Sequence, residues 1–201
     1  MGKIGRKAEI IKEARWLFHT KGYDSTTMQN IMERLDIAKG TIYHYFKSKE
    51  ELFEAVIENI VEENLAEMEQ LFLELKGNAL EKIEALLLKG NLSSEELLNE
   101  LHKPANAAMH LRILTAILRK QAPIYAALIA QGCKEGLFQV QYPLESVEMI
   151  LFSIQFLTDI GIHPWSQEEL FRRLQAYPNI IESLLKAPPG SFNFLPNLWK
   201  G

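Results

Sequence analysis

Residues 25–52, STTMQNIMERLDIAKGTIYHYFKSKEEL, decide the fold that this sequence predicts. The stretch opens on two typical N-cap residues, Thr26 and Thr27, and Gln29 stands where a capping box with Thr26 needs it. Apolar residues then recur at helical spacing. Asp36 follows, and aspartate tolerates the left-handed backbone that ends many helices. The pattern therefore predicts a short helix that stops at a tight turn.

The next helix, expected over about 38–46, has two faces of different chemistry. Its apolar face would pack on a core and consists of Ala38, Ile42 and Phe46, with Tyr45 at the edge. Its opposite face offers hydrogen-bond donors, flat rings and positive charge, and consists of Lys39, Gly40, Tyr43 and His44, flanked by Thr41. A glycine inside a helix costs about 1 kcal/mol relative to alanine. Close approach of the helix backbone to a DNA strand would explain Gly40.

The start of a third helix adds features that suit an anion. Ser48 is a typical N-cap residue, and Glu51 completes its capping box. Lys49 lies in the first turn, where the helix dipole disfavours a cation unless an anion is near. Thr27 can donate to a phosphate in the same way. An ordinary exposed surface explains any one of these side chains, but together they predict a helix-turn-helix whose second helix enters a DNA major groove.

Residues 11–52 resemble the TetR family of bacterial one-component transcriptional regulators. Order, spacing and residue type agree at Ile11, Ala14, Leu17-Phe18, Gly22-Tyr23, Thr26-Thr27, Ile31, Ile37, Lys39-Gly40-Thr41-Ile42-Tyr43-His44-Tyr45-Phe46 and Ser48-Lys49-Glu50-Glu51-Leu52. Two positions depart from the family pattern. Arg34-Leu35-Asp36 replaces the small, glycine-containing turn usual there, and Ala38 replaces a common serine, which removes one hydroxyl that could bind phosphate.

The resemblance implies an all-α protein with two domains. Residues 1–47 would form a three-helix DNA-binding domain, and residues 48–201 a helical domain that dimerises and binds a small-molecule effector. The residues expected to contact a double-stranded DNA operator are Thr27, Lys39, Gly40, Thr41, Tyr43, His44, Tyr45 and Lys49. The implied function is a transcriptional repressor that a small-molecule inducer releases from a palindromic operator.

The distribution of charge fits a protein that touches DNA with one end. The 201 residues carry a net charge of −4, yet residues 1–50 hold ten Lys/Arg and only six Asp/Glu. Cys133 is the only cysteine, so no intramolecular disulfide can form and a reducing cytoplasm is expected. The chain does not begin with a signal-peptide pattern, and no uninterrupted apolar run reaches the ~18 residues of a membrane span. No membrane partner is therefore expected.

The remainder of the chain also predicts helices. Their expected bounds are 48–76, 79–89, 94–102, 107–120, 123–136, 143–161 and 167–187. Ser166 and Glu169 would cap the last of these, and Pro178 would bend or split it. The tail 187–201 is rich in proline and aromatic residues, which fits either a segment packed on the protein or a disordered end.

The helix expected at 143–161 is apolar nearly all round, so more than one of its sides must be covered. A partner subunit would cover the side that its own core does not. In the resembled family the last two helices of each subunit form a four-helix dimer bundle. The interface residues expected on this basis are Ile150, Ile154, Leu157, Leu174, Ile181, Leu184 and Leu185.

The effector site is also expected from the resemblance, inside the C-terminal domain. The candidate lining residues are Phe72, Met109, Ile113, Ile117, Tyr125, Phe152, Gln155 and Phe156. These side chains are mostly apolar and aromatic with few charges, which favours a hydrophobic or weakly polar effector. Each of them also fits an ordinary place in a helical core.

No pattern in the sequence supports catalysis or a cofactor. His102, His110 and His163 lack metal-ligand spacing, and Asp159 and His163 fit a helix cap or a surface pair. A phosphate-binding loop, a nucleophile elbow and a carboxylate pair are all missing from the sequence. We therefore expect no enzyme, no metal and no cofactor. The alternative is an all-α enzyme or ligand carrier that does not bind DNA.

Overall fold

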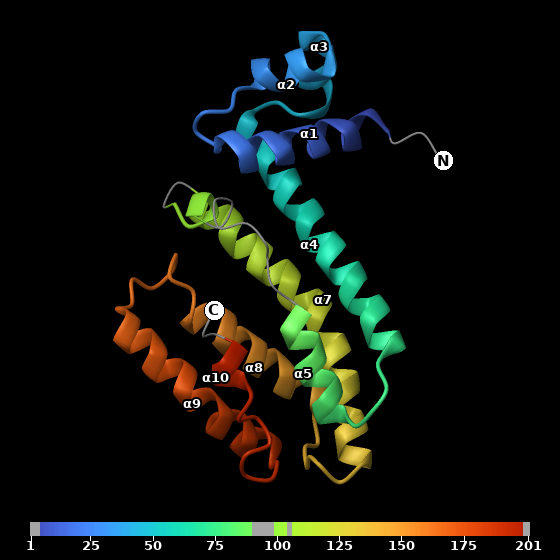
Figure 1. Cartoon of the computed structure of the whole chain (residues 1–201), viewed down its shortest axis with the longest axis vertical. Coiled ribbons are helices and arrows are strands. Elements are labelled where there is room, and N and C mark those ends of the chain that lie inside the picture. Colours follow the sequence, from blue (N-terminus) through green and yellow to red (C-terminus); the bar gives the residue numbers. More distant parts are fainter. Residues whose placement is uncertain (1–4, 90–98, 104–105, 199–201) are drawn as a thin grey trace. The chain divides into compact units, whose positions relative to one another are not determined.

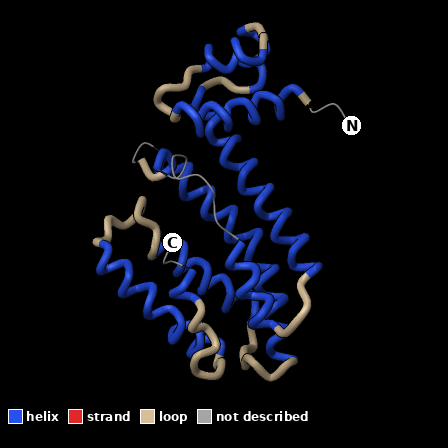
Figure 2. The backbone as a smooth tube through the Cα atoms, viewed as in Figure 1, coloured by secondary structure: helices blue, strands red, loops and turns tan. Residues whose placement is uncertain are grey.

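The computed structural model describes residues 5–89, 99–103 and 106–198, and every long regular element in these ranges is an α-helix (Figures 1 and 2). The predicted all-α class is confirmed. The helices are α1 (Arg6–Lys21), α2 (Met28–Leu35), α3 (Lys39–Tyr45), α4 (Lys49–Glu74), α5 (Ala79–Lys89), α7 (Ala107–Lys134), α8 (Pro143–Leu157), α9 (Gln167–Leu185) and α10 (Leu195–Leu198).

The chain divides into two compact units that do not follow the predicted boundary between residues 47 and 48. The first unit, called the head unit below, comprises Met1–Glu63 and Leu92–Ile113. The second, called the body unit, comprises Asn64–Asn91 and Leu114–Gly201. Both α4 and α7 therefore contribute residues to each unit.

In the head unit, α1, α2, α3 and the start of α4 bury apolar side chains against one another. Phe18 and Phe53 are fully buried, and their rings meet edge to face with centroids 5.7 Å apart. The cap of α2 differs from the prediction. Thr27, not Thr26, forms a capping box, and its partner is Asn30: the Asn30 N–H donates to Thr27 Oγ1 at 3.2 Å, and the Thr27 N–H donates to Asn30 Oδ1 at 3.1 Å.

Thr26 is instead a core residue, because its hydroxyl is fully buried and donates to the Gly22 carbonyl at 2.9 Å. The predicted end of α2 is confirmed, and the predicted cap of α4 is confirmed in part. Asp36 ends α2 in the left-handed region, with φ of 49°. Ser48 caps α4 by accepting from the Glu51 N–H at 3.2 Å, although the Glu51 carboxylate accepts from the Lys47 N–H rather than from Ser48.

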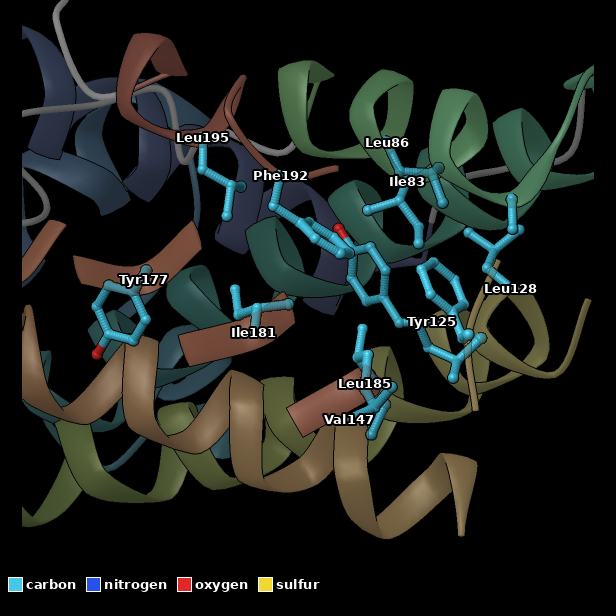
Figure 3. Packing of buried hydrophobic residues seen from close by; sticks show 14 of the residues in the cluster. Ile83, Leu86, Tyr125, Leu128, Val147, Tyr177, Ile181, Leu185, Phe192 and Leu195 are labelled. Carbon is cyan, nitrogen blue, oxygen red and sulfur yellow. The ribbon is translucent and has the colours of Figure 1, made fainter. Parts of the chain in front are cut away.

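The core of the body unit draws on α5, α7, α8, α9 and the C-terminal tail (Figure 3). The buried side chains labelled there are Ile83, Leu86, Tyr125, Leu128, Val147, Tyr177, Ile181, Leu185, Phe192 and Leu195. The tail is thus packed on its own unit, the first of the two alternatives for residues 187–198. A backbone hydrogen bond from the Gln139 N–H to the Leu185 carbonyl, at 2.9 Å, ties the loop after α7 to the end of α9.

Two prolines interrupt helices less than the sequence predicts. A single helix, α7, runs through Pro123, where two helices were expected, and α9 continues through the buried Pro178. An internal proline removes one hydrogen bond and costs about 3 kcal/mol. Side chains next to each proline, Ala122 and Tyr177, are buried in the body core, and this packing favours the helical path over a break.

Two other expectations need correction or fall outside the described residues. The helix expected at 143–161 ends at Leu157, because Asp159 turns the chain by accepting the Gly161 and Ile162 N–H groups at 2.8 and 3.0 Å. Most of the helix expected at 94–102 lies in residues 90–98, which are outside the described part of the chain.

By length and composition alone, one segment of the described chain, Met109–Lys134 in α7, could cross a membrane. Arg119 and Lys120 interrupt this segment, so it contains no uninterrupted apolar run of the length of a membrane span. Core helices of soluble proteins pass the same test. Leu128 and Ile129 of this helix are buried in the body core.

Candidate nucleic-acid interface and ligand pocket

Helix α3 presents the polar face that the sequence predicts. Its core side holds Ile42 and Phe46, which are 0% and 2% exposed. On the other side Lys39, Gly40 and His44 are exposed, and Tyr43 keeps 40% of its surface. Thr41 and Tyr45 lie half-buried between the two sides. Ala38 is exposed rather than part of the core stripe, because it precedes the first helical turn as the N-cap.

The side chains of this face form two contacting pairs. The Lys39 ammonium lies 5.7 Å from the centroid of the Tyr43 ring, and the rings of His44 and Tyr45 meet edge to face at 5.0 Å. These pairs bring together a cation, a phenol and an imidazole with no carboxylate on the helix. Such groups donate hydrogen bonds to base edges and phosphates and stack on flat rings.

Gly40 is not required by the packing of α3. A Cβ atom built on it would meet no atom within 4 Å, and its φ is not in the left-handed region. The fold would therefore accept alanine at this position. A backbone left bare on an exposed helical face fits close approach by another molecule, as the sequence suggests.

Lys49 is less available than the sequence suggests. Its ammonium donates to the Tyr23 carbonyl at 3.1 Å and lies 4.0 Å from the centroid of the Tyr23 ring. Burial, together with the carboxylates of Glu50, Glu100 and Asp24, raises the pKa of Tyr23 to about 12, so this phenol is neutral. An ammonium has three N–H donors, so Lys49 could still donate to a phosphate. To do so it would give up part of its contact with Tyr23.

The cap of α2 uses the Thr27 hydroxyl only as an acceptor, so it does not engage the hydroxyl proton of this residue. Its Oγ1 accepts from the Asn30 N–H in the α2 cap, and the side chain is exposed. The predicted DNA-contacting residues therefore lie on three elements of the head unit: the start of α2, α3, and the first turn of α4.

A link within the head unit had no signal in the sequence. The Lys103 ammonium lies 2.7 Å from an Asp24 carboxylate oxygen and 2.5 Å from a Glu100 carboxylate oxygen. The hydrogen bond from Lys103 holds the pKa of Asp24 below its usual value. Asp24 and Lys103 are 79 positions apart, so no local pattern could pair them. This link attaches residues 99–103 to the turn between α1 and α2.

The body unit contains a pocket of about 420 Å³, at the small end of the ~300–1,000 Å³ typical of ligand sites. Its wall includes residues from α4, α5, α7, α8, α9 and the C-terminal segment. The lining residues are Met68, Ile83, Leu87, Leu88, Gln121, Tyr125, Ile129, Val147, Ile150, Leu151, Ile154, Gln155, Ile181, Leu185, Phe192, Leu195 and Asn197.

Of the eight residues expected to bind the effector, the structure places Tyr125 and Gln155 at this pocket. Phe72 is half-buried and Ile117 is buried, both outside the pocket in the body unit. Met109 and Ile113 belong to the head unit, where they are buried. Phe152 and Phe156 stack with ring centroids 5.4 Å apart, and Phe152 is 52% exposed.

The expected dimer interface also needs revision. Four of its seven residues line the pocket instead: Ile150, Ile154, Ile181 and Leu185. Ile181 and Leu185 are only 4% and 1% exposed, which leaves almost no surface for a partner. Leu174 is half-buried against the body core, whereas Leu157 and Leu184 are exposed.

Large apolar side chains are nevertheless exposed on α8 and α9. They are Leu144, Met149, Phe152, Leu157, Phe171, Ile180 and Leu184. Contiguous apolar patches on the surface of globular proteins are typical of interaction sites. The expectation that a partner covers these two helices keeps its basis, with different residues in contact.

The histidines do not form a catalytic arrangement within either unit. The backbone N–H of His163 donates to the Asp159 carbonyl at 2.9 Å, and the His163 ring stacks on Trp165 with centroids 5.0 Å apart. In the head unit the rings of His102 and His110 also lie 5.0 Å apart, a proximity that their spacing in the sequence did not predict.

These features define a class of protein: an all-α chain with a helix-turn-helix in one unit and a ligand-sized pocket in the other. Comparison with known proteins gives the family. The family described as "Bacterial regulatory proteins, tetR family" matches residues 10–56, and the one described as "Tetracyclin repressor-like, C-terminal domain" matches residues 90–180. The chain belongs to the TetR family of regulatory proteins, so the family resemblance is confirmed and the enzyme alternative is set aside.

Individual relatives agree over parts of the chain. This chain is 37% identical over 68 residues to the HTH-type transcriptional regulator YfiR of Bacillus subtilis. The match covers 34% of this chain and 33% of that protein. The chain is 30% identical over 83 residues to the HTH-type transcriptional repressor KstR2 of Mycolicibacterium smegmatis, which is 41% of this chain and 40% of that protein. The chain thus spans about a third to two-fifths of the length of these curated relatives.

One solved structure agrees over nearly the whole chain. A transcriptional regulator of the TetR/AcrR family from Thermobifida fusca is 25% identical, with a TM-score of 0.61, and the match covers 98% of this chain and 100% of that one. The arrangement of the helices is therefore that of the family in both units.

Proposed function

We propose that this protein is a cytoplasmic transcriptional repressor that binds a palindromic DNA operator as a homodimer and is released by a small, hydrophobic effector. The observation that carries the proposal is the exposed face of α3, which is free of acidic groups and bears a glycine that the fold does not need. Membership of the TetR family supports a role in regulation, and the name of KstR2 supports repression.

Dimerisation is proposed from the exposed apolar side chains of α8 and α9. A symmetric dimer uses the same surface of both subunits, so residues such as Leu157 and Leu184 would contact a second copy of this chain. Two identical heads would then read two half-sites of opposite orientation. The operator should be a near-palindrome with half-sites about one helical turn apart or slightly more.

Effector binding would act on DNA through α4 and α7. Met68 on α4 and Tyr125 on α7 line the pocket, and both helices extend into the head unit, where Lys49 begins α4. A ligand that binds one arrangement of these helices better than the other shifts the population between the two. Coupling of about 1–3 kcal/mol is typical of such regulators and would suffice for release.

The test is sequence-specific DNA binding by the full chain. Removal of residues 1–47 would strip the partners from buried Leu52 and Phe53, so surface variants are the better probe. A Lys39→Ala/Tyr43→Ala double variant should lose preference for a selected operator over random DNA. Lys76→Ala, which removes an equally exposed charge from the body unit, should keep it. Equal binding of all DNA by the unmodified protein would favour a ligand carrier instead.

A further inference from the structure

The wall of the pocket in the body unit contains no charged side chain among the described residues. Thirteen of its seventeen residues are apolar, and the four polar ones are Gln121, Tyr125, Gln155 and Asn197. Arginine, lysine, histidine, aspartate and glutamate are all missing from this lining, although they are common on the same helices. The described part of the wall therefore offers amide and phenol groups but no counter-ion for a charged ligand.

Burial of a charge without a counter-ion is costly. The effective penalty for an ion inside a protein is several kcal/mol, so a carboxylate or an ammonium in this pocket would bind far more weakly than a neutral group of the same shape. A hydroxyl or amide of the ligand faces no such penalty, because the glutamine amides can both donate and accept.

The only buried acid among the described residues of the body unit is already engaged. Glu182 follows Ile181 on α9 and is 7% exposed, but it is not part of the lining. Its carboxylate accepts the Phe192 N–H at 3.0 Å, which fixes the C-terminal segment that brings Phe192, Leu195 and Asn197 to the pocket. Glu182 thus serves the pocket by holding its wall, and the ammonium probe described below tests whether it also attracts a cation.

Tyr125 adds a phenol to the neutral amide groups in the wall of the pocket. Burial raises the pKa of its phenol, so the group remains protonated and can donate one hydrogen bond. Figure 3 shows the Tyr125 ring in the same cluster as Phe192, Ile181 and Leu185, all of which line the pocket. A polar ligand group near this hydroxyl would be surrounded by apolar contacts on its other sides.

We propose that the pocket binds an uncharged, largely apolar molecule that carries one or two hydrogen-bonding groups, and that it rejects carboxylates and ammonium ions. This inference rests on the proposed function, because it names the chemical class of the effector for the same pocket. It goes further than a hydrophobic lining does, since fatty acids and amphiphilic amines are also hydrophobic and are excluded here.

Three probes of one shape test the charge rule on the full-length protein: 2-naphthalenemethanol, 2-naphthoate and 2-naphthylmethylammonium. Binding is measured by isothermal titration at pH 7. The neutral alcohol should bind at least tenfold more tightly than either ion. A naphthoate or ammonium affinity equal to that of the alcohol would overturn the proposal, and so would the absence of measurable binding by the alcohol.

A nearly isosteric substitution locates the binding. Gln121→Glu places a carboxylate in the wall of the pocket. It should lower the affinity for the alcohol at least tenfold and raise the affinity for the ammonium probe. Gln141→Glu, at an exposed position outside the pocket, should change neither affinity. Identical probe preferences in Gln121→Glu and the unmodified protein would show that the probes bind elsewhere, which contradicts the proposal.

Failure of this inference can be told apart from failure of the proposed function. The probe titrations need no DNA. If the alcohol binds in the pocket but leaves operator binding unchanged at saturation, the effector role is contradicted and the ligand class stands. If instead a carboxylate or an ammonium compound binds through Gln121 and releases the operator, the regulator stands and the ligand class is overturned.

Discussion

The exposed face of α3 and the exposed side chains of α8 and α9 differ in chemistry. Lys39, Tyr43 and His44 on α3 are polar or basic, whereas the large exposed side chains on α8 and α9 are aliphatic or aromatic. Net charge differs in the same way: residues 1–50 carry +4 and residues 51–201 carry −8. A surface of the first kind suits a hydrated polyanion, and one of the second kind suits another apolar surface.

Two helical glycines sharpen this contrast. A Cβ atom on Gly132 of α7 would lie 2.2 Å from the ring of Phe138, so the body core requires glycine there. A Cβ atom on Gly40 of α3 would meet nothing within 4 Å. One glycine is explained by the protein itself. The other is explained only if something outside the protein comes close to α3.

The largest expected effect concerns the apolar surface of α8 and α9. Leu157→Glu and Leu184→Glu should each dissociate the dimer, because an unpaired carboxylate buried at an interface costs about 3–5 kcal/mol. Operator binding should then fall more than a hundredfold, although the head is unchanged. Sedimentation velocity and operator titration measure the two effects.

Leu73→Glu is the matched control for this prediction, since Leu73 is an 80% exposed leucine of the body unit outside α8 and α9. It should remain dimeric and bind DNA. A dimer that survives both substitutions in α8 and α9 would mean that these helices face solvent, and the proposed interface would have to be abandoned.

The next largest effect concerns specificity. Lys39→Ala and Tyr43→Ala should each reduce discrimination between operator and random DNA by about 1–3 kcal/mol, the value of one good base contact. Circular dichroism should stay unchanged, because both side chains are exposed. Operator and random-DNA affinities, measured at one salt concentration, decide the matter; equal losses on both DNAs would assign these residues to phosphates instead.

The glycine pair should give opposite changes in stability. Gly132→Ala forces the buried Phe138 ring to move and should lower the free energy of unfolding by about 1–3 kcal/mol. Gly40→Ala should raise it by up to about 1 kcal/mol and weaken operator binding. Urea unfolding and DNA titration of both variants test this. Unchanged operator affinity in Gly40→Ala would remove the argument for close approach to α3.

The smallest effect is expected at the phosphate-contacting positions. Thr27→Ala and Lys49→Ala should weaken binding to all DNA sequences alike, and Lys49→Ala should lower the slope of log K against log salt by at most about 0.9. The Tyr23 carbonyl and ring already hold the Lys49 ammonium, so the loss in affinity should be smaller than at Lys39. If Lys49→Ala lowered the salt slope by a full unit and also reduced sequence specificity, the assignment of Lys49 to phosphates and of Lys39 to bases would be contradicted.

The head could be predicted in detail because its signals are local. Helical spacing and caps within residues 25–52 identified α2, α3 and the start of α4. The error at Thr26 arose because two adjacent threonines fit the same cap and only the structure shows which one is buried. Ala38 was predicted in the core stripe but is exposed, because it is the N-cap of α3. Contacts between distant residues, such as Lys103 with Asp24, leave no local pattern to detect.

In the body unit the helices were predicted more closely than the pocket, where only Tyr125 and Gln155 of the eight candidate residues lie. Helix α8 is apolar nearly all round, and periodicity cannot tell which side faces a pocket and which faces a partner. Ile150 and Ile154 were therefore assigned to an interface although they line the pocket. The C-terminal segment was left open for a similar reason, since its aromatic residues find their place only once α5, α7 and α9 are assembled.

Selection of DNA from a random pool by the full-length protein tests the central claim most directly, namely that two copies of α3 read DNA as a symmetric pair. The account predicts enrichment of one near-palindromic sequence, with half-sites about one helical turn apart or slightly more, and loss of that enrichment in the Lys39→Ala/Tyr43→Ala variant. A selected sequence without two-fold symmetry, or one that the double variant enriches equally well, would contradict it.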